Sequence, residues 1–333
     1  MNTTLSSNCS VCDKTLSLES SVVCSECDDR VCEDCSQKCD KGCQSKHPKE
    51  TNTKEIKNKK HLLLVDGHAV AFYSWFASGQ RNVTRLFFHM IVEALYRNKC
   101  SHLIVTFDPE PPTFRHDIYP AYKANRPPHP EEFFSQVKDL EQILKSFGIP
   151  QYKIKWFEAD DVLGTLSSVF SEENWEKTIF TCDTDLLQIV SRSTFVDIFS
   201  QYRSNRLFDL NATKEKYEGI NPELLADLKA LTGDRSDNFP GLPGIGEKTA
   251  IKLIKNLGSL ENIYKNLNKI SDIFPRASKK IHYILQTNQE LAFTMRQLST
   301  IVKTVPISNT EIDLKFVDQG LVAKMNKVRF QIS

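Results

Sequence analysis

Three short apolar segments, each followed closely by an aspartate, dominate the middle of the chain. They are residues 61–65 (HLLLV) before Asp66, 102–107 (HLIVTF) before Asp108, and 177–181 (KTIFT) before Asp183. Continuous apolar runs of this length, separated by segments with helical periodicity, are typical of buried strands in a mostly parallel sheet. Parallel strands end at one edge of their sheet, where α/β folds carry the functional crevice. The sequence therefore predicts an α/β fold with acidic groups gathered at one edge.

The spacing of apolar residues predicts the remaining elements. Between residues 61 and 220 we expect helices at 83–96, 132–147, 159–170 and 186–190, and strands at 152–156 and 194–199, in addition to the three buried strands. From residue 222 the pattern predicts only helices, at 222–231, 247–256, 260–266, 277–286 and 288–298. We therefore divide the chain into a cysteine-rich segment (1–48), a polar linker (49–60), an α/β core (61–220) and a helical region (221–333).

Composition excludes some classes of protein. The chain has 333 residues, of which 40% are hydrophobic, and 43 Lys+Arg against 42 Asp+Glu. This balance argues against a wholly basic coat for nucleic acid. No apolar run is long enough to cross a membrane, and the first residues lack the pattern of a signal peptide. We expect a soluble, intracellular monomer that binds no membrane, with its cytoplasmic, nuclear or viral setting left open.

Acidic residues cluster at the strand ends and in two later motifs, FEADDVLG and LTGDRSDN. Any one of them has the alternative interpretation of a turn former or helix N-cap. As a set they would repel one another unless divalent cations neutralised them, and carboxylates are ligands that Mg²⁺ or Mn²⁺ prefers. Two such ions about 4 Å apart suit the hydrolysis of a phosphodiester bond. The candidate ligands are Asp66, Asp108, Glu158, Asp160, Asp161, Asp183, Asp185, Asp234 and Asp237.

Two other segments have features that favour nucleic acid. Residues 239–250 (FPGLPGIGEKTA) have the form of a helix-hairpin-helix, in which glycines let backbone amides approach phosphates. The candidate contacts there are Gly241, Gly244, Gly246, Lys248, Thr249 and Lys252. A basic loop at 114–126 interleaves aromatic and cationic side chains, which can stack on unpaired bases and neutralise phosphates. The alternatives are an ordinary turn between helices and a solvated surface loop.

Five segments in order carry a resemblance to a known family. They are LLLVDGHAVAFYSWF, VTFDPEPPTFRHDIYPAYKANRPP, FEADDVLG, TCDTDLLQIV and LTGDRSDNFPGLPGIGEKTA. From about residue 61 to about residue 307 the chain resembles the 5′ nuclease domain of bacterial DNA polymerase I, within the flap endonuclease superfamily. The resemblance implies a PIN-like α/β core, a helix-three-turn-helix region and hydrolysis at the 5′ ends of DNA or RNA primers. It also implies cleavage at 5′ flaps.

The resemblance also implies roles for individual residues. Asp66, Asp108, Glu158, Asp160 and Asp161 match ligands of a first metal ion, and Asp183, Asp185, Asp234 and Asp237 match ligands of a second. Lys123 and Arg126 match positions that contact the scissile phosphate, Tyr122 is the aromatic beside it, and we add Arg115 to this catalytic set. The hairpin of the family often binds a monovalent cation such as K⁺. The implied partners are DNA with 5′ flaps, nicks or RNA primers.

The first segment of the chain predicts a zinc finger. Cysteine pairs two residues apart close on a tetrahedral zinc ion, and a segment this short needs metal for its folding energy. Its candidate ligands are Cys9, Cys12, Cys24, Cys27, Cys32, Cys35, Cys39, Cys43 and His47. Cross-brace and serial pairings both fit the spacing. The segment is not basic, so we expect a structural finger or one that docks a protein partner.

Some alternatives stay open from the sequence. A scaffold that binds flap DNA without cutting it would carry the same folds, and a PIN-type ribonuclease would carry the same acids. The relative preference for exonuclease or flap cleavage, and for DNA or RNA, is also open. Outside the first segment, the two cysteines, Cys100 and Cys182, are interpreted as packing residues.

Overall fold

The computed structural model describes residues 60–170, 174–200, 206–307 and 312–330, and four short strands nearer the N-terminus. The chain divides into two compact units, residues 1–57 and 58–333. In the first unit β1 (Ser7–Asn8) pairs with β2 (Thr15–Leu16), and β3 (Ser21–Val23) pairs with β4 (Arg30–Cys32), both antiparallel. The predicted zinc ligands lie outside the described residues, except for the backbone of Cys32 in β4.

The second unit is built on a seven-stranded sheet. Its strands are β5 (Lys60–Asp66), β6 (His102–Thr106), β7 (Gln151–Tyr152), β8 (Trp175–Thr181), β9 (Thr194–Ile198), β10 (Arg206–Phe208) and β13 (Lys315–Phe316). The order is β10-β9-β8-β5-β6-β13, with β7 also paired to β6. Strands β5 to β9 pair in parallel, and only β10 and β13 run antiparallel to their neighbours. The predicted mostly parallel sheet is confirmed.

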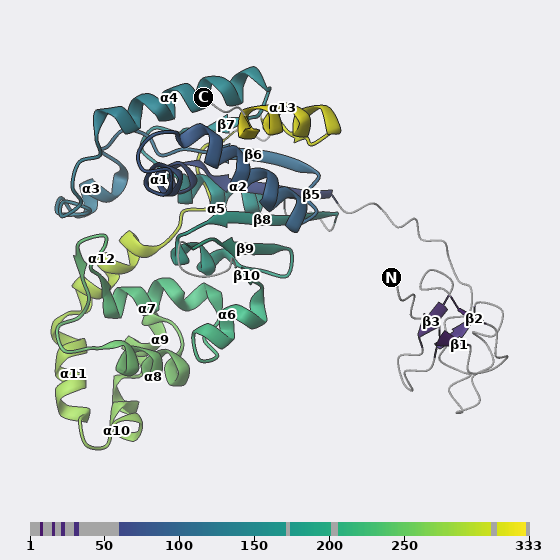
Figure 1. Cartoon of the computed structure of the whole chain (residues 1–333). Coiled ribbons are helices and arrows are strands. Elements are labelled where there is room, and N and C mark those ends of the chain that lie inside the picture. Colours follow the sequence, from purple (N-terminus) through teal and green to yellow (C-terminus); the bar gives the residue numbers. More distant parts are fainter. Residues whose placement is uncertain are drawn as a thin grey trace. The chain divides into compact units, whose positions relative to one another are not determined.

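Both faces of the sheet are covered, because alternate side chains of β5 enter two different cores. Leu63 and Val65 pack with α1 (Gly67–Ala77), α2 (Val83–Arg97), α4 (Glu131–Ser146) and α13 (Gln319–Phe330). Leu62 and Leu64 face the other way, toward α5 (Ala159–Val169) and the helical region. Figure 1 shows the sheet between these two layers. All four leucine and valine side chains are fully buried.

The helical region continues the second core rather than forming one of its own. It contains α6 (Leu210–Lys216), α7 (Leu225–Thr232), α8 (Glu247–Leu257), α9 (Leu260–Lys265), α10 (Ile270–Ile273), α11 (Ser278–Thr287) and α12 (Gln289–Ser299). Apolar residues of α7, α8, α11 and α12 belong to the same cluster as Leu62 and Ile179 of the sheet. The parts that the sequence divides at residue 220 therefore share one core.

Three local predictions differ from the structure. The strand expected at 152–156 ends at Tyr152, because residues 154–157 form a tight turn. The helix expected at 186–190 is a short 3-10 helix, η2 (Thr184–Ile189). The C-terminal part of the predicted helical region returns to the sheet instead, where β13 pairs with β6 and α13 packs on α2 through Leu321 and Met325.

Candidate active site

Four aspartates meet at the carboxyl edge of the sheet. Asp66 is the last residue of β5, Asp108 follows β6, and Asp183 follows β8. Asp160 lies in the first turn of α5. We call these four residues the first acid group. Their convergence follows from the parallel pairing, because β6 and β8 flank β5 on its two sides.

Hydrogen bonds from neighbouring elements orient two of these carboxylates. Asp66 caps α1, with Oδ1 accepting from the Ala69 amide at 3.0 Å and Oδ2 from the Thr181 hydroxyl at 2.8 Å. Asp108 Oδ1 accepts from the Ala159 amide at 2.8 Å. Each carboxylate is thus tied to the strand or helix beside it, which keeps the group in place before any ligand binds.

The electrostatics of the first acid group favour a bound cation. Burial and the charge of Asp108 together raise the pKa of Asp66 to about 7. Burial also raises the pKa of Asp160 well above its usual value, with added repulsion from Asp183, Asp66 and Asp108. Carboxylates that repel one another in this way lose that cost when a divalent cation neutralises them. The oxygen donors present fit a hard ion such as Mg²⁺.

A second acid group consists of Asp185, Asp234 and Asp237. One carboxylate oxygen from each lies within 4.8 Å of those of the other two. Asp185 comes from η2, whereas Asp234 and Asp237 lie in the turn after α7. The Asp185 amide donates to Asp183 Oδ1 at 2.8 Å, so Asp183 connects the two groups. The resemblance implies Asp183 as a ligand of the second ion, whereas in the structure it lies at the junction of the two groups.

Lys229, which belongs to none of the sequence motifs, lies inside the second acid group. Its ammonium group forms ion pairs with Asp185 and Asp234. Burial and Asp183 raise the pKa of Asp185 to about 7 despite this lysine. Burial by itself would raise the pKa of Asp234, but hydrogen bonds from Lys229 and Ser236 hold it at about 2. Nothing in the sequence around Lys229 indicated this contact, which depends on how α7 packs against η2.

The basic loop brings two cations to the acids. Lys123 Nζ lies 2.9 Å from Glu158 Oε1, and Arg126 pairs with Asp237. Burial alone would lower the pKa of Lys123, but Glu158, Asp237 and Asp108 raise it above its usual value. The loop is fixed at this place because the Lys123 amide donates to the Asp237 carbonyl at 2.9 Å. Lys123 and Arg126 therefore lie at the acids, as a phosphate-binding role requires.

Tyr122 connects Glu158 with the second acid group. Its hydroxyl is within hydrogen-bond distance of Glu158 Oε2 at 3.0 Å and Asp237 Oδ2 at 3.2 Å. The side chain is 3% exposed, so its ring is not available to stack on a base. The base stacking expected of aromatic side chains in this loop therefore does not apply to Tyr122, whose hydroxyl contacts two carboxylates instead.

Arg115 and Asp161 form a buried pair, and Arg115 Nη1 also lies 3.4 Å from Glu158 Oε2. Arg115 donates to both carboxylate oxygens of Asp161, at 2.7 and 2.9 Å, and to the carbonyls of Leu298 and Thr300. Asp161 also accepts from the amides of Glu158 and Val302. Both side chains are buried, and both oxygens of Asp161 are occupied. The predicted catalytic role of Arg115 and ligand role of Asp161 therefore do not fit these positions.

The predicted DNA-binding hairpin lies between α7 and α8. A side chain at Gly241 would meet the Thr232 and Gly233 backbone at 2.3–2.4 Å, so this glycine is needed for packing. Gly244 has φ of +91° and is exposed, and Gly246 is the N-cap of α8. Lys248 and Lys252 are exposed on α8, whereas Thr249 is half-buried. The lysines and two of the glycines thus remain exposed, whereas Gly241 is half-buried.

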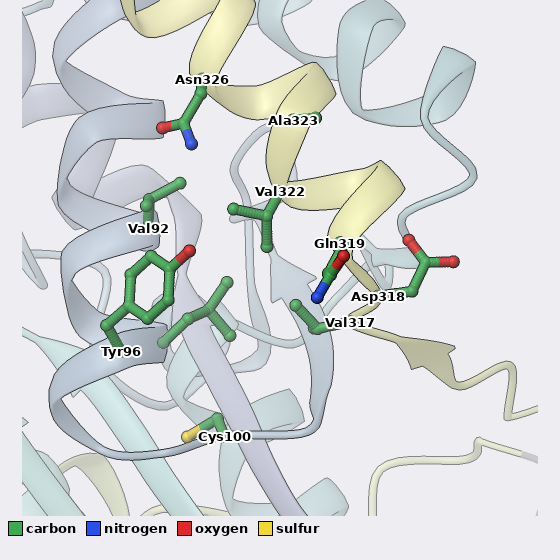
Figure 2. A pocket seen from close by; sticks show the side chains of 10 residues that line it. Val92, Tyr96, Cys100, Val317, Asp318, Gln319, Val322, Ala323 and Asn326 are labelled. Atoms are coloured by element: carbon green, nitrogen blue, oxygen red, sulfur yellow. The ribbon is translucent and has the colours of Figure 1, made fainter.

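The two cysteines of the second unit differ. Cys182 is exposed beside Asp183, so the interpretation of it as a packing residue is wrong. Cys100 is half-buried against the core that contains Leu63 and Val65. A hollow of about 420 Å³ lies between α2 and α13. Figure 2 shows Cys100 at one end of this hollow. Cys100 precedes β6, so this hollow lies toward the amino ends of the strands, opposite the acids. It contains none of the predicted site residues.

Comparison with known proteins places the chain in a family. One family model, for the N-terminal resolvase-like domain of 5′-3′ exonucleases, matches residues 61–218, and a second, for their C-terminal SAM fold, matches residues 220–319. The chain belongs to the 5′-3′ exonuclease family. Among the described residues of this family member, no helix is both long enough and apolar enough to span a membrane.

Two curated relatives illustrate the match. The 5′-3′ exonuclease of Buchnera aphidicola is 35% identical over 269 residues, covering 78% of this chain and 88% of that protein. DNA polymerase I of Bacillus caldotenax is 33% identical over 285 residues, covering 82% of this chain but 32% of that protein. This 5′-3′ exonuclease family member therefore spans about a third of the polymerase that it matches.

Two solved structures share the fold. A flap endonuclease of bacteriophage T5, in a complex with DNA and metal ions, aligns with a TM-score of 0.64 at 21% identity, over 82% of this chain and 100% of that chain. The catalytic core of Rad2 with a DNA substrate aligns with a TM-score of 0.54 at 16% identity, over 82% of this chain and 88% of that chain. The predicted α/β nuclease fold with an added helical region is confirmed.

Proposed function

We propose that the protein is a divalent-metal-dependent 5′-3′ nuclease that hydrolyses phosphodiester bonds at the 5′ ends of DNA, including 5′ flaps and RNA primers. The observation that carries the proposal is the pairing of two acid groups with two cations. Asp183 joins the groups, Arg126 pairs with Asp237 of the second group, and Lys123 pairs with Glu158 beside the first group, close enough for its charge to act on Asp108 and Asp160. Such a site binds both the metal ions and the phosphate between them.

The two acid groups are the proposed holders of two Mg²⁺ or Mn²⁺ ions. Asp66, Asp108, Asp160 and Asp183 would hold the first, and Asp185, Asp234 and Asp237 the second. Glu158, which the resemblance implies as a further ligand of the first ion, pairs with Lys123 instead. When bound, such ions supply Lewis acidity and neutralise negative charge at the scissile phosphate. The raised pKa of Asp66 and the carboxylate-only donor set support this assignment. The ammonium of Lys229 occupies part of the second group, so it would have to move aside for the second ion.

The chain's own residues have distinct proposed tasks. Lys123 and Arg126 would bind the phosphate whose bond breaks and stabilise the charge that develops on it. Tyr122 would hold Glu158 and Asp237 in their orientation. Arg115 would act indirectly, since its guanidinium fixes Asp161 next to Asp160 on α5.

The hairpin is the proposed site for duplex DNA. Gly244 and Gly246 are exposed there, and Lys248 and Lys252 follow on the outer face of α8. These contacts would bind phosphates irrespective of sequence, so affinity should fall as salt concentration rises. A K⁺ ion at the hairpin is part of the proposal and rests on the resemblance alone.

Cleavage of a 5′-labelled flap duplex tests the proposed activity. We expect short products with Mg²⁺ and none with EDTA, and no cleavage by the Asp183→Ala, Asp185→Ala double variant. Asp139→Ala is the matched control, because Asp139 is an exposed acid on α4. Binding of the flap without cleavage by the wild-type protein would support the scaffold alternative instead. Faster cleavage of matched RNA than of DNA would support the ribonuclease alternative.

The proposed Zn²⁺ of residues 1–48 needs its own experiment. The cysteine spacing supports it, and a protein partner is the proposed ligand of the finger. Metal analysis of the full chain should find zinc, and a variant lacking residues 1–48 should lose it while it keeps nuclease activity. Equal zinc content in both proteins would exclude a zinc site in this segment.

A further inference from the structure

An unusual backbone conformation occurs just before α5. The Phe157 amide donates to the Ile154 carbonyl at 3.2 Å, which closes a four-residue turn. Trp156 is the third residue of this turn, with φ of +83°. A turn with positive φ at its third residue normally has glycine there, because a side chain at that position is strained. A bulky aromatic residue in this conformation is rare.

The Trp156 side chain is only partly packed against the protein, so burial of its ring does little to offset the backbone strain. It is 38% exposed, whereas Trp75 and Trp175, which complete the set of three tryptophans, are 1% and 7% exposed. The indole therefore presents apolar surface to solvent from a backbone position that disfavours it. Strained backbone residues that the surrounding structure holds in place are concentrated at active sites and ligand-binding sites.

The surroundings of Trp156 connect it to the catalytic elements. Its carbonyl accepts from the Phe114 amide at 3.1 Å, which anchors the turn to the start of the basic loop. The Phe114 and Phe157 rings pack with their centroids 5.8 Å apart. On the other side, the turn leads directly into Glu158 and the first turn of α5. Trp156 is thus fixed between the basic loop and the helix that holds Asp160.

A lysine precedes Trp156 in the same turn. Lys155 is exposed and forms no ion pair within the part of the chain that the structure describes. An exposed aromatic ring beside a lysine is the combination that single-stranded nucleic acid uses, with a base on the ring and a phosphate at the ammonium. A duplex cannot use it in the same way, since its bases are already stacked.

We propose that Trp156 stacks on an unpaired base of the single-stranded 5′ overhang and that Lys155 contacts its phosphate. This rests on the proposed nuclease function and adds to it a residue that favours overhangs over flush ends. Because stacking on an aromatic ring tolerates any base, the contact should show little sequence preference.

Tryptophan fluorescence tests the contact without cleavage. In EDTA, oligo(dT) should quench the emission of the wild-type protein, since Trp156 is the exposed indole, and should not quench that of Trp156→Phe. In anisotropy measurements with a labelled oligo(dT), Trp156→Gly should bind about tenfold more weakly, and Trp156→Phe within about threefold of wild type. Unchanged affinity of Trp156→Gly would overturn the proposal.

Two substrates separate this proposal from the proposed function. Trp156→Gly should lower kcat/KM about tenfold on a 5′ flap and leave a nicked duplex with a flush 5′ end unaffected. Its melting temperature should not fall, because glycine relieves the strain, so a loss of activity would not reflect unfolding. Equal effects on both substrates would refute the stacking role. If the wild-type protein cuts neither substrate, the nuclease proposal fails, and the fluorescence result still decides the stacking.

Discussion

Replacing Arg115 with alanine should destabilise the fold. The guanidinium is 3% exposed and donates to Asp161 through two hydrogen bonds and to the Leu298 and Thr300 carbonyls. Without it, the Asp161 carboxylate is buried with no cation, and both carbonyls lose a donor. Burial alone would lower the pKa of Arg115, but Asp161 raises it, in line with a strong pair.

The size of this effect follows from the burial of both partners. Removing one member of a buried, hydrogen-bonded ion pair costs about 3–5 kcal/mol. In a domain of this size each kcal/mol lowers the melting temperature by about 2–4 °C, which predicts a fall of about 6–20 °C. Arg115→Lys keeps the charge but not the two-pronged geometry, so its loss should be smaller.

Urea unfolding and thermal melting would measure the effect, with Arg126→Ala as the control. The Arg126 side chain is 48% exposed, so losing its pair with Asp237 should change stability by less than about 1 kcal/mol. We expect the opposite order for catalysis, with Arg126→Ala losing activity while fully folded. If Arg115→Ala unfolds at the wild-type urea concentration and still lacks activity, Arg115 acts on the substrate, and the positioning role is wrong.

Three other outcomes are expected. In the folded state, burial and neighbouring charges raise the pKa of Asp66 and of Asp185 to about 7, so both groups stay protonated to a higher pH than in the unfolded state. The melting temperature without metal should therefore fall as the pH rises from about 4 to about 8. Mg²⁺ should restore it more at pH 8 than at pH 5, and equal restoration would contradict the assigned metal groups. Lys229→Gln should lower the melting temperature without metal but enlarge the gain from Mg²⁺, and a smaller gain would mean that the lysine does not compete with the ion. Lys123→Ala should slow single-turnover cleavage about 100-fold, and a wild-type rate would remove Lys123 from the phosphate site.

The strands and the acids could be predicted from sequence because their signals are local. Continuous apolar runs marked β5, β6 and β8, and the aspartates after them were expected to converge. Parallel pairing then left little freedom in where Asp66, Asp108 and Asp183 lie. The glycine-rich hairpin was equally visible, although packing against the end of α7 explains Gly241 better than a phosphate contact.

Other features depended on contacts between distant segments. Asp161 follows Asp160 in the same helical turn, yet it points to Arg115 and Val302 rather than to the acids. One residue along a helix rotates a side chain by about 100°, so neighbours in sequence can face a cleft and a core. The apolar periodicity of residues 159–170 predicts a helix, but it does not predict which face of that helix packs against residues 298–302.

The sequence by itself determined the alternation of strands and helices, the acids at the strand ends and the likeness to 5′ nucleases, because each depends on residue types at short spacing. Only the tertiary structure decided that Lys229 enters the second acid group, that Tyr122 is buried, and that residues 315–330 return to the sheet. These contacts join residues far apart in the chain. They depend on how whole helices and strands pack into one core, and short-range sequence patterns do not predict that packing.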